Sequence, residues 1–132
     1  MCIRTVYVVG TVVATVALFV LLCHLLCRGC RLSGAAIFVG CVHLALVLVN
    51  ACVIELDMLQ THPSEALMGW LWFDLADLPV SLIGIAASVM IKSFTLREIV
   101  FPIAFYGIAG TAQYMFFTEL CSRMIGGIFK RQ

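Results

Sequence analysis

Two carboxylates stand inside an apolar segment, where charge is least expected. Asp74 and Asp77 lie three residues apart in the run from Trp70 to Ile91. An ionised carboxylate in hydrocarbon is costly unless it is paired, wet or protonated, so a buried one favours a functional role. Loss of a proton at Asp77 would then be coupled to whatever enters the same space, as in proton-linked carriers.

Polar residues of the other apolar runs are expected at the same depth as these aspartates. Counting turns from the ends of the runs places Asn50, Gln113 and Tyr114 at a similar level. We therefore expect Asp77, the deeper aspartate, to bond to one of these three side chains. The candidates for a shared polar pocket are Asp74, Asp77, Asn50, Gln113, Tyr114 and Ser81.

An alternative is that the aspartates lie in the headgroup region rather than in a pocket. Trp70, Trp72 and Tyr114 are of the types that mark the membrane–water interface. In that case Asp74 is wet and the two carboxylates end a polar interface. The acidic connection in the middle of the chain could extend this polar region; it contains Glu55, Asp57, His62 and Glu65. Because these residues lack the tight spacing of a metal site, the pattern favours a solvated loop.

Cysteine and histidine suggest two further chemistries. Cys27 and Cys30 form a C-x-x-C beside Arg28, which suits a redox pair at the membrane edge, but a quinone-linked thiol oxidoreductase would want a second pair in a loop. Cysteine in a span usually acts as a small apolar residue, so we expect reduced thiols. His24 and His43 lie on consecutive segments and could hold a haem, yet their depths differ by about one turn. The sequence identifies no cofactor.

The helices that position these residues are predicted from the composition and from the charged residues that border the apolar runs. Of 132 residues, 64% are hydrophobic and 11% charged, which excludes disorder, a secreted disulfide scaffold and a nucleic-acid-binding domain. The chain is predicted to form a single domain, residues 1–132, of an all-α integral membrane protein. We predict an up-and-down bundle of four transmembrane helices at about 6–27, 35–56, 70–91 and 96–121.

Local signals refine these four segments. Pro79 and Pro102 each remove a backbone donor, and Pro79 is expected to free the carbonyl of Leu75. Thr95 and Glu98 have the spacing of a capping box at the start of the fourth segment. Small residues at i, i+4 predict close packing of helices, and the pairs are Gly10–Ala14, Ala36–Gly40, Gly84–Ser88 and Gly107–Thr111.

The charge pattern hardly decides the orientation. Four crossings place four basic residues on each side of the membrane, and only weaker signs favour both termini outside. The C-terminal tail, from Ser122 to Gln132, mixes apolar and basic residues and is expected to lie along the interface.

Two short segments carry a resemblance. Asp77-Leu78-Pro79-Val80-Ser81 and Gly110-Thr111-Ala112-Gln113-Tyr114-Met115-Phe116 resemble the D-x-P-x-S and G-T-x-x-aromatic patterns of small bacterial four-helix membrane proteins. The resemblance covers the second half of the chain and departs at Gln113-Tyr114-Met115, where an aromatic cluster is usual. It implies a bacterial inner membrane and no catalytic activity.

The functional expectation is a non-enzymatic accessory or interaction subunit that packs against a larger membrane assembly. The small size and the lack of any recognisable reaction motif favour it. Its partners would be the lipid bilayer and other membrane subunits or a second copy, with no nucleic acid. One alternative is a small homodimeric transporter or ion pathway that uses Asp77, and another is a lipid- or quinone-linked enzyme.

Overall fold

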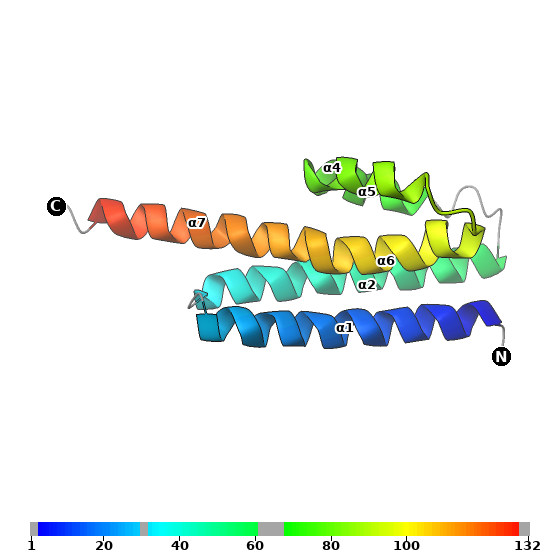
Figure 1. Ribbon diagram of the computed structural model, residues 1–132, viewed down its shortest axis with the longest axis horizontal. Coiled ribbons are helices and arrows are strands. Elements are labelled where there is room, and N and C mark those ends of the chain that lie inside the picture. The colour runs from blue at the N-terminus through cyan, green and yellow to red at the C-terminus, as the bar shows by residue number, and fades with distance from the viewer. Residues whose placement is uncertain (1–2, 30–31, 61–67, 130–132) are drawn as a thin grey trace.

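Three long helices lie side by side in the computed structural model, which describes residues 3–29, 32–60 and 68–129 (Figure 1). They are α1 (Ile3–Gly29), α2 (Gly34–Gln60) and a continuous third helix made of η2 (Leu96–Val100), α6 (Phe101–Phe105), η3 (Tyr106–Gly110) and α7 (Thr111–Phe129). The spans Thr5–Leu26, Gly34–Leu56 and Leu96–Gly126 are long and apolar enough to cross a membrane, as in a multi-pass membrane protein. The described residues are all-helical and contain no strand.

The predicted third crossing at 70–91 is wrong as a continuous helix. The structure has η1 (Met68–Trp70), α4 (Leu71–Ala76), a turn at residues 77–79 and α5 (Val80–Ser88). With 6 and 9 residues, α4 and α5 reach only about 9 Å and about 14 Å, against a hydrocarbon layer of about 30 Å. Pro79 lacks a backbone N–H and interrupts the helix, so four crossings are not confirmed.

The two short helices form a hairpin against α2 and the third long helix. Met68 at the start of η1 and Ser88 at the end of α5 line the same cavity, so both arms of the hairpin open at one end of the molecule. Figure 1 shows the chain passing from α5 back to that end before α6 begins, while α7 runs to the opposite end. The start of α1 and the end of α7 therefore lie at opposite ends.

Small residues set how closely the long helices approach. A Cβ at Gly40 would lie 2.6 Å from the side chain of Met115, so α2 and α7 pack closely only because this position is glycine. The first residue of each other predicted pair is also buried: Ala36 on α2, Gly84 on α5 and Gly107 in η3. By contrast, Gly10 and Ala14 are exposed on α1, and a Cβ at Gly10 would meet nothing within 4 Å.

Two local expectations differ from the structure at the ends of the third long helix. Thr95 makes no capping hydrogen bond, and Glu98 bonds instead to Arg97. The residues from Ser122 to Phe129 extend α7 rather than forming a separate interfacial tail, because their helical hydrogen bonding continues without a break.

The basic residues are no longer balanced in this topology. By sequence, the connection after α1 and the end of α7 contribute five basic residues (Arg28, Arg31, Arg123, Lys130 and Arg131), and the opposite end contributes three (Arg4, Lys92 and Arg97). The positive-inside rule then predicts that the α1–α2 connection faces the cytoplasm.

A pair of reporter fusions tests this topology. Three crossings and a hairpin that opens on one side predict that reporters placed after Gln60 and after Gln132 read opposite sides of the membrane, with the second one cytoplasmic. A reporter between Arg28 and Ser33 serves as the control and should match the C-terminal one. Equal sidedness after Gln60 and Gln132 would restore the four-crossing arrangement.

Candidate functional site

His43 and Asp77 form a buried pair between α2 and the turn of the α4–α5 hairpin. Nε2 of His43 lies 3.0 Å from Oδ1 of Asp77, and Nδ1 lies 3.0 Å from Oγ1 of Thr111 at the start of α7. The exposed fraction is 0% for Asp77 and Thr111 and 7% for His43. Three elements that are distant in sequence therefore meet at one imidazole ring.

This pair lies close to the middle of the apolar spans. Thr111 is the midpoint of the span Leu96–Gly126. His43 lies nine residues after Gly34 and thirteen before Leu56, or about 14 Å and about 20 Å at the rise of an α-helix. The headgroup alternative for Asp77 does not fit this depth.

The geometry accommodates the pair in two forms that differ by one proton. With Asp77 ionised, Nε2–H of His43 donates to the carboxylate and the hydroxyl of Thr111 donates to Nδ1. With Asp77 protonated, its O–H donates to Nε2, and Nδ1–H donates to the Thr111 oxygen. The second form carries one proton more than the first, and rotation of the Thr111 hydroxyl keeps both hydrogen bonds in each form, so the pair can take up and release one proton without moving heavy atoms.

One oxygen of Asp77 has no hydrogen-bond partner among the described residues. Oδ2 is buried, and it faces the backbone of Gly110 so closely that a Cβ at this position would collide with it. The same Cβ would lie 3.0 Å from Cε1 of His43. Gly110 thus provides the space in which the carboxylate sits, and it ends the π-helical turn η3, a distortion that is frequent at functional sites.

Three of the predicted pocket residues hold the turn of the hairpin rather than Asp77 itself. Nε2 of Gln113 donates to the carbonyl of Leu78 at 3.0 Å, and the hydroxyl of Tyr114 donates to the carbonyl of Ala76 at 2.9 Å. The hydroxyl of Ser81 donates to the carbonyl of Asp74 at 2.6 Å. These donors reach carbonyls at the end of α4 and in the turn, on either side of Leu75, whose carbonyl we expected to be free.

The expected partners of Asp77 are therefore corrected to His43. Tyr114 contributes to the pair by stacking on His43, with ring centroids 4.6 Å apart. Asn50 lies elsewhere, where its Nδ2 donates to the carbonyl of Gly69 at 3.3 Å and fastens η1 to α2.

Asp74 belongs to a separate polar group nearer the open end of the hairpin. Its carboxylate accepts a hydrogen bond from the hydroxyl of Tyr106. Tyr106 stacks on Trp70, whose indole nitrogen is buried without a partner among the described residues. The structure thus separates two aspartates that the sequence analysis placed in one pocket.

Sequence reasoning missed Tyr106 and Thr111 as site residues, and it considered His43 only for haem. Nothing in the spacing of Tyr106 distinguishes it from other aromatic residues of its segment. His43 did carry a signal, because it is a polar side chain near the middle of an apolar run. Its partner could not be assigned while the third segment was read as a straight helix.

The remaining candidates are placed as follows. His24 is exposed on α1, whereas both ring nitrogens of His43 are hydrogen-bonded, so a haem between them would require one of these bonds to break. The side chain of Cys27 and all of Cys30 lie outside the described residues, as do His62 and Glu65. Over residues 3–29, 32–60 and 68–129, no three His, Cys, Asp or Glu side chains cluster as a metal site.

Substitution of Gly110 by alanine tests the packing of the pair. The added Cβ would meet Asp77 Oδ2, so we expect Gly110→Ala to lower the free energy of unfolding by about 1–3 kcal/mol, measured as a lower thermal midpoint in detergent. Gly126→Ala is the matched control on α7, where a Cβ meets nothing within 4 Å and stability should hold or rise. Equal behaviour of the two variants would contradict the close approach at Gly110.

Comparison with protein-family models, with curated proteins and with solved structures finds no significant match. The site is therefore interpreted from its own geometry, and its chemistry from the buried histidine, aspartate and threonine.

Proposed function

We propose that this protein is a small membrane carrier or ion pathway in which His43 and Asp77 take up and release a proton near the middle of the membrane. The observation that carries the proposal is the fully buried Asp77 carboxylate, bonded to an imidazole on one oxygen and without a partner among the described residues on the other. A carboxylate in this environment accepts and returns a proton as its surroundings change.

Stability alone does not explain the pair. A buried pair of ionisable groups contributes little compared with well-packed apolar residues of the same volume, although removal of one partner is destabilising. The sequence has many apolar residues, and the neighbouring positions of α2 are alanine, leucine and valine. The presence of two ionisable side chains among these apolar residues favours a chemical role over a packing role.

The architecture around the pair supports the same proposal. Short, interrupted helices that end near the middle of the membrane form the binding sites of many secondary transporters. Here the turn between α4 and α5 carries Asp77, and His43 also lines a hollow of about 300 Å³ between α2, α4 and α7. A ligand that enters this hollow would contact the imidazole ring of His43, which bonds to Asp77.

The location and assembly belong to the same proposal. We place the protein in a bacterial inner membrane on the resemblance of its D-x-P-x-S and G-T-x-x-aromatic segments. A second copy would enlarge the enclosed space, because three long helices and a hairpin surround little volume.

Proton flux into liposomes tests the role of Asp77. Purified protein is reconstituted with an internal pH-sensitive dye, and a potassium diffusion potential is imposed. We expect the wild type to acidify the lumen faster than empty liposomes, and Asp77→Asn to reduce the rate to the background of empty liposomes because an amide cannot exchange the proton. Asn can still accept the hydrogen bond from His43, so folding should be retained.

Glu119→Gln is the matched control for this experiment. It removes the charge of a carboxylate that bonds to Ser33, just before α2, and to Arg123 on α7, away from the His43–Asp77 pair. Its flux should equal that of the wild type. Flux by Asp77→Asn at the wild-type rate would assign a structural role to the pair, and wild-type flux equal to that of empty liposomes would remove the carrier proposal.

An accessory or interaction subunit is the second candidate, favoured by one specific observation. Gly10 and Ala14 form a small-residue pair that faces outward on α1, whereas the other three pairs begin inside the bundle. Exposed small residues permit the backbone of a further helix to approach closely.

Bulky substitution of Gly10 tests this contact. We expect wild-type protein extracted in native lipid discs to travel in a particle larger than one chain, and Gly10→Leu to release it because the side chain blocks helix approach. Gly126→Leu, at a position where a Cβ likewise meets nothing within 4 Å, is the control. A particle size that Gly10→Leu does not change would remove α1 as the contact surface.

A further inference from the structure

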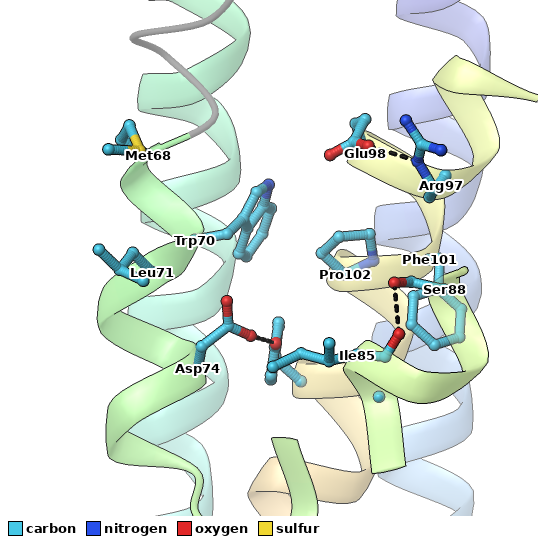
Figure 2. Close-up of a pocket in the computed structure, with 12 residues that line it drawn as sticks. Met68, Trp70, Leu71, Asp74, Ile85, Ser88, Arg97, Glu98, Phe101 and Pro102 are labelled. Atoms are coloured by element: carbon cyan, nitrogen blue, oxygen red, sulfur yellow. Dashed lines mark hydrogen bonds and ion pairs between the residues drawn. The ribbon is translucent and has the colours of Figure 1, made fainter. Parts of the chain in front are cut away.

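A cavity of about 210 Å³ lies between the arms of the hairpin and the third long helix (Figure 2). Its walls come from η1 and α4 on one side, from α5 on another and from η2 and α6 behind them. Asp77, His43 and Thr111 do not line it. The cavity is therefore distinct from the buried pair, although the same hairpin carries residues of both.

The charges that line this cavity leave an excess of one negative charge. Arg97 and Glu98 are paired with each other, so their charges cancel. Asp74 remains, and within the part of the chain that the structure describes no Lys, Arg or His pairs with it. In Figure 2 one carboxylate oxygen of Asp74 is bonded to the tyrosine hydroxyl, and the other points toward Trp70. A ligand that carries one positive charge would complete this wall.

Aromatic rings form much of the remaining surface. Trp70 and Tyr106 stack with centroids 5.9 Å apart, and Phe101 also lines the cavity. Aromatic faces attract organic cations through the ring quadrupole, and a desolvated site strengthens this attraction. One carboxylate with aromatic walls suits an organic ammonium ion rather than a small inorganic cation, which requires many oxygen ligands.

Trp70 adds a requirement for an acceptor on the ligand. Its exposed fraction is 6%, and its Nε1 has no hydrogen-bond partner among the described residues. Figure 2 shows the indole standing between α4 and Pro102, with its nitrogen toward the end where Glu98 lies. A buried N–H without a partner is unfavourable, so an oxygen of the ligand would satisfy it.

We infer that this cavity binds a small organic ammonium ion that carries a hydroxyl group, with the cation at Asp74 and the oxygen at Trp70. The inference deepens the proposed function, since it names the class of substrate for the carrier. Binding itself can be measured without transport, which keeps the two proposals separable.

Fluorescence of Trp70 provides a direct binding test. The protein has two tryptophans, and Trp72 is exposed, so Trp72→Phe leaves Trp70 as the reporter. We expect choline to change the emission saturably in detergent. The probe 3,3-dimethylbutan-1-ol, which has the same shape without the charge, should bind at least about tenfold more weakly. Equal affinity for the two probes would overturn the inference.

Asp74→Asn and Ser88→Phe, each combined with Trp72→Phe, test the charge and the volume of the site. Asp74→Asn keeps an acceptor for Tyr106 but removes the charge, so choline affinity should fall about tenfold or more. Ser88→Phe fills the cavity without touching the charge and should abolish binding. Glu119→Gln, away from the cavity, should bind choline as the parent does, and circular dichroism shows which variants are folded. Unchanged binding in folded Asp74→Asn or folded Ser88→Phe would overturn the inference.

Transport measurements separate this inference from the proposed function. Choline binding that depends on Asp74, together with no proton flux above empty liposomes either with or without choline, supports the cation site and rejects the carrier. Proton flux that depends on Asp77, without choline binding to the wild-type site, keeps the carrier and rejects the cation site.

Discussion

Backbone groups exposed by a helix break cannot be solvated by hydrocarbon, and this constraint organises the structure around residues 77–79. Wherever a helix stops inside a membrane, other parts of the protein must provide its missing hydrogen-bond partners. The carbonyls around the turn receive donors from side chains of α5 and α7: Ser81 to Asp74, Tyr114 to Ala76 and Gln113 to Leu78. The hairpin can end at this depth only because α7 presents an amide and a hydroxyl to it.

The same fastening determines what Asp77 can do. With the turn held against α7, the carboxylate lies between Gly110 and His43, and no water or lipid contact remains to it, since its exposed fraction is 0%. Its charge must then be balanced by the imidazole or removed by protonation. Thr111 accommodates both forms, because a hydroxyl can donate or accept. Structure and proposed chemistry therefore depend on the same few contacts.

The hairpin also connects the two polar groups of the molecule. Ser81 donates to the carbonyl of Asp74, and its own backbone N–H donates to the carbonyl of Asp77 at 3.0 Å. Tyr106 bonds to Asp74 at one end of η3, while Gly110 receives Asp77 at the other end. A ligand that displaced α4 in the cavity would therefore act on the elements that hold the buried pair. In this way the proposed cation site and the proposed proton site are connected through one hairpin.

The hydrophobic pattern alone predicts the class of the protein, the bounds of its first two helices to within a few residues, and the presence of Asp77 inside an apolar segment. These follow from local properties, since the hydrophobic length of a segment and an aspartate within it are visible without knowledge of neighbours. The broken third segment and the pairing of Asp77 with His43 were decided only by the tertiary structure. Proline in an apolar segment is compatible with a kinked crossing or with a reversal of direction. The choice between them depends on whether distant side chains, here Gln113 and Tyr114, satisfy the freed carbonyls.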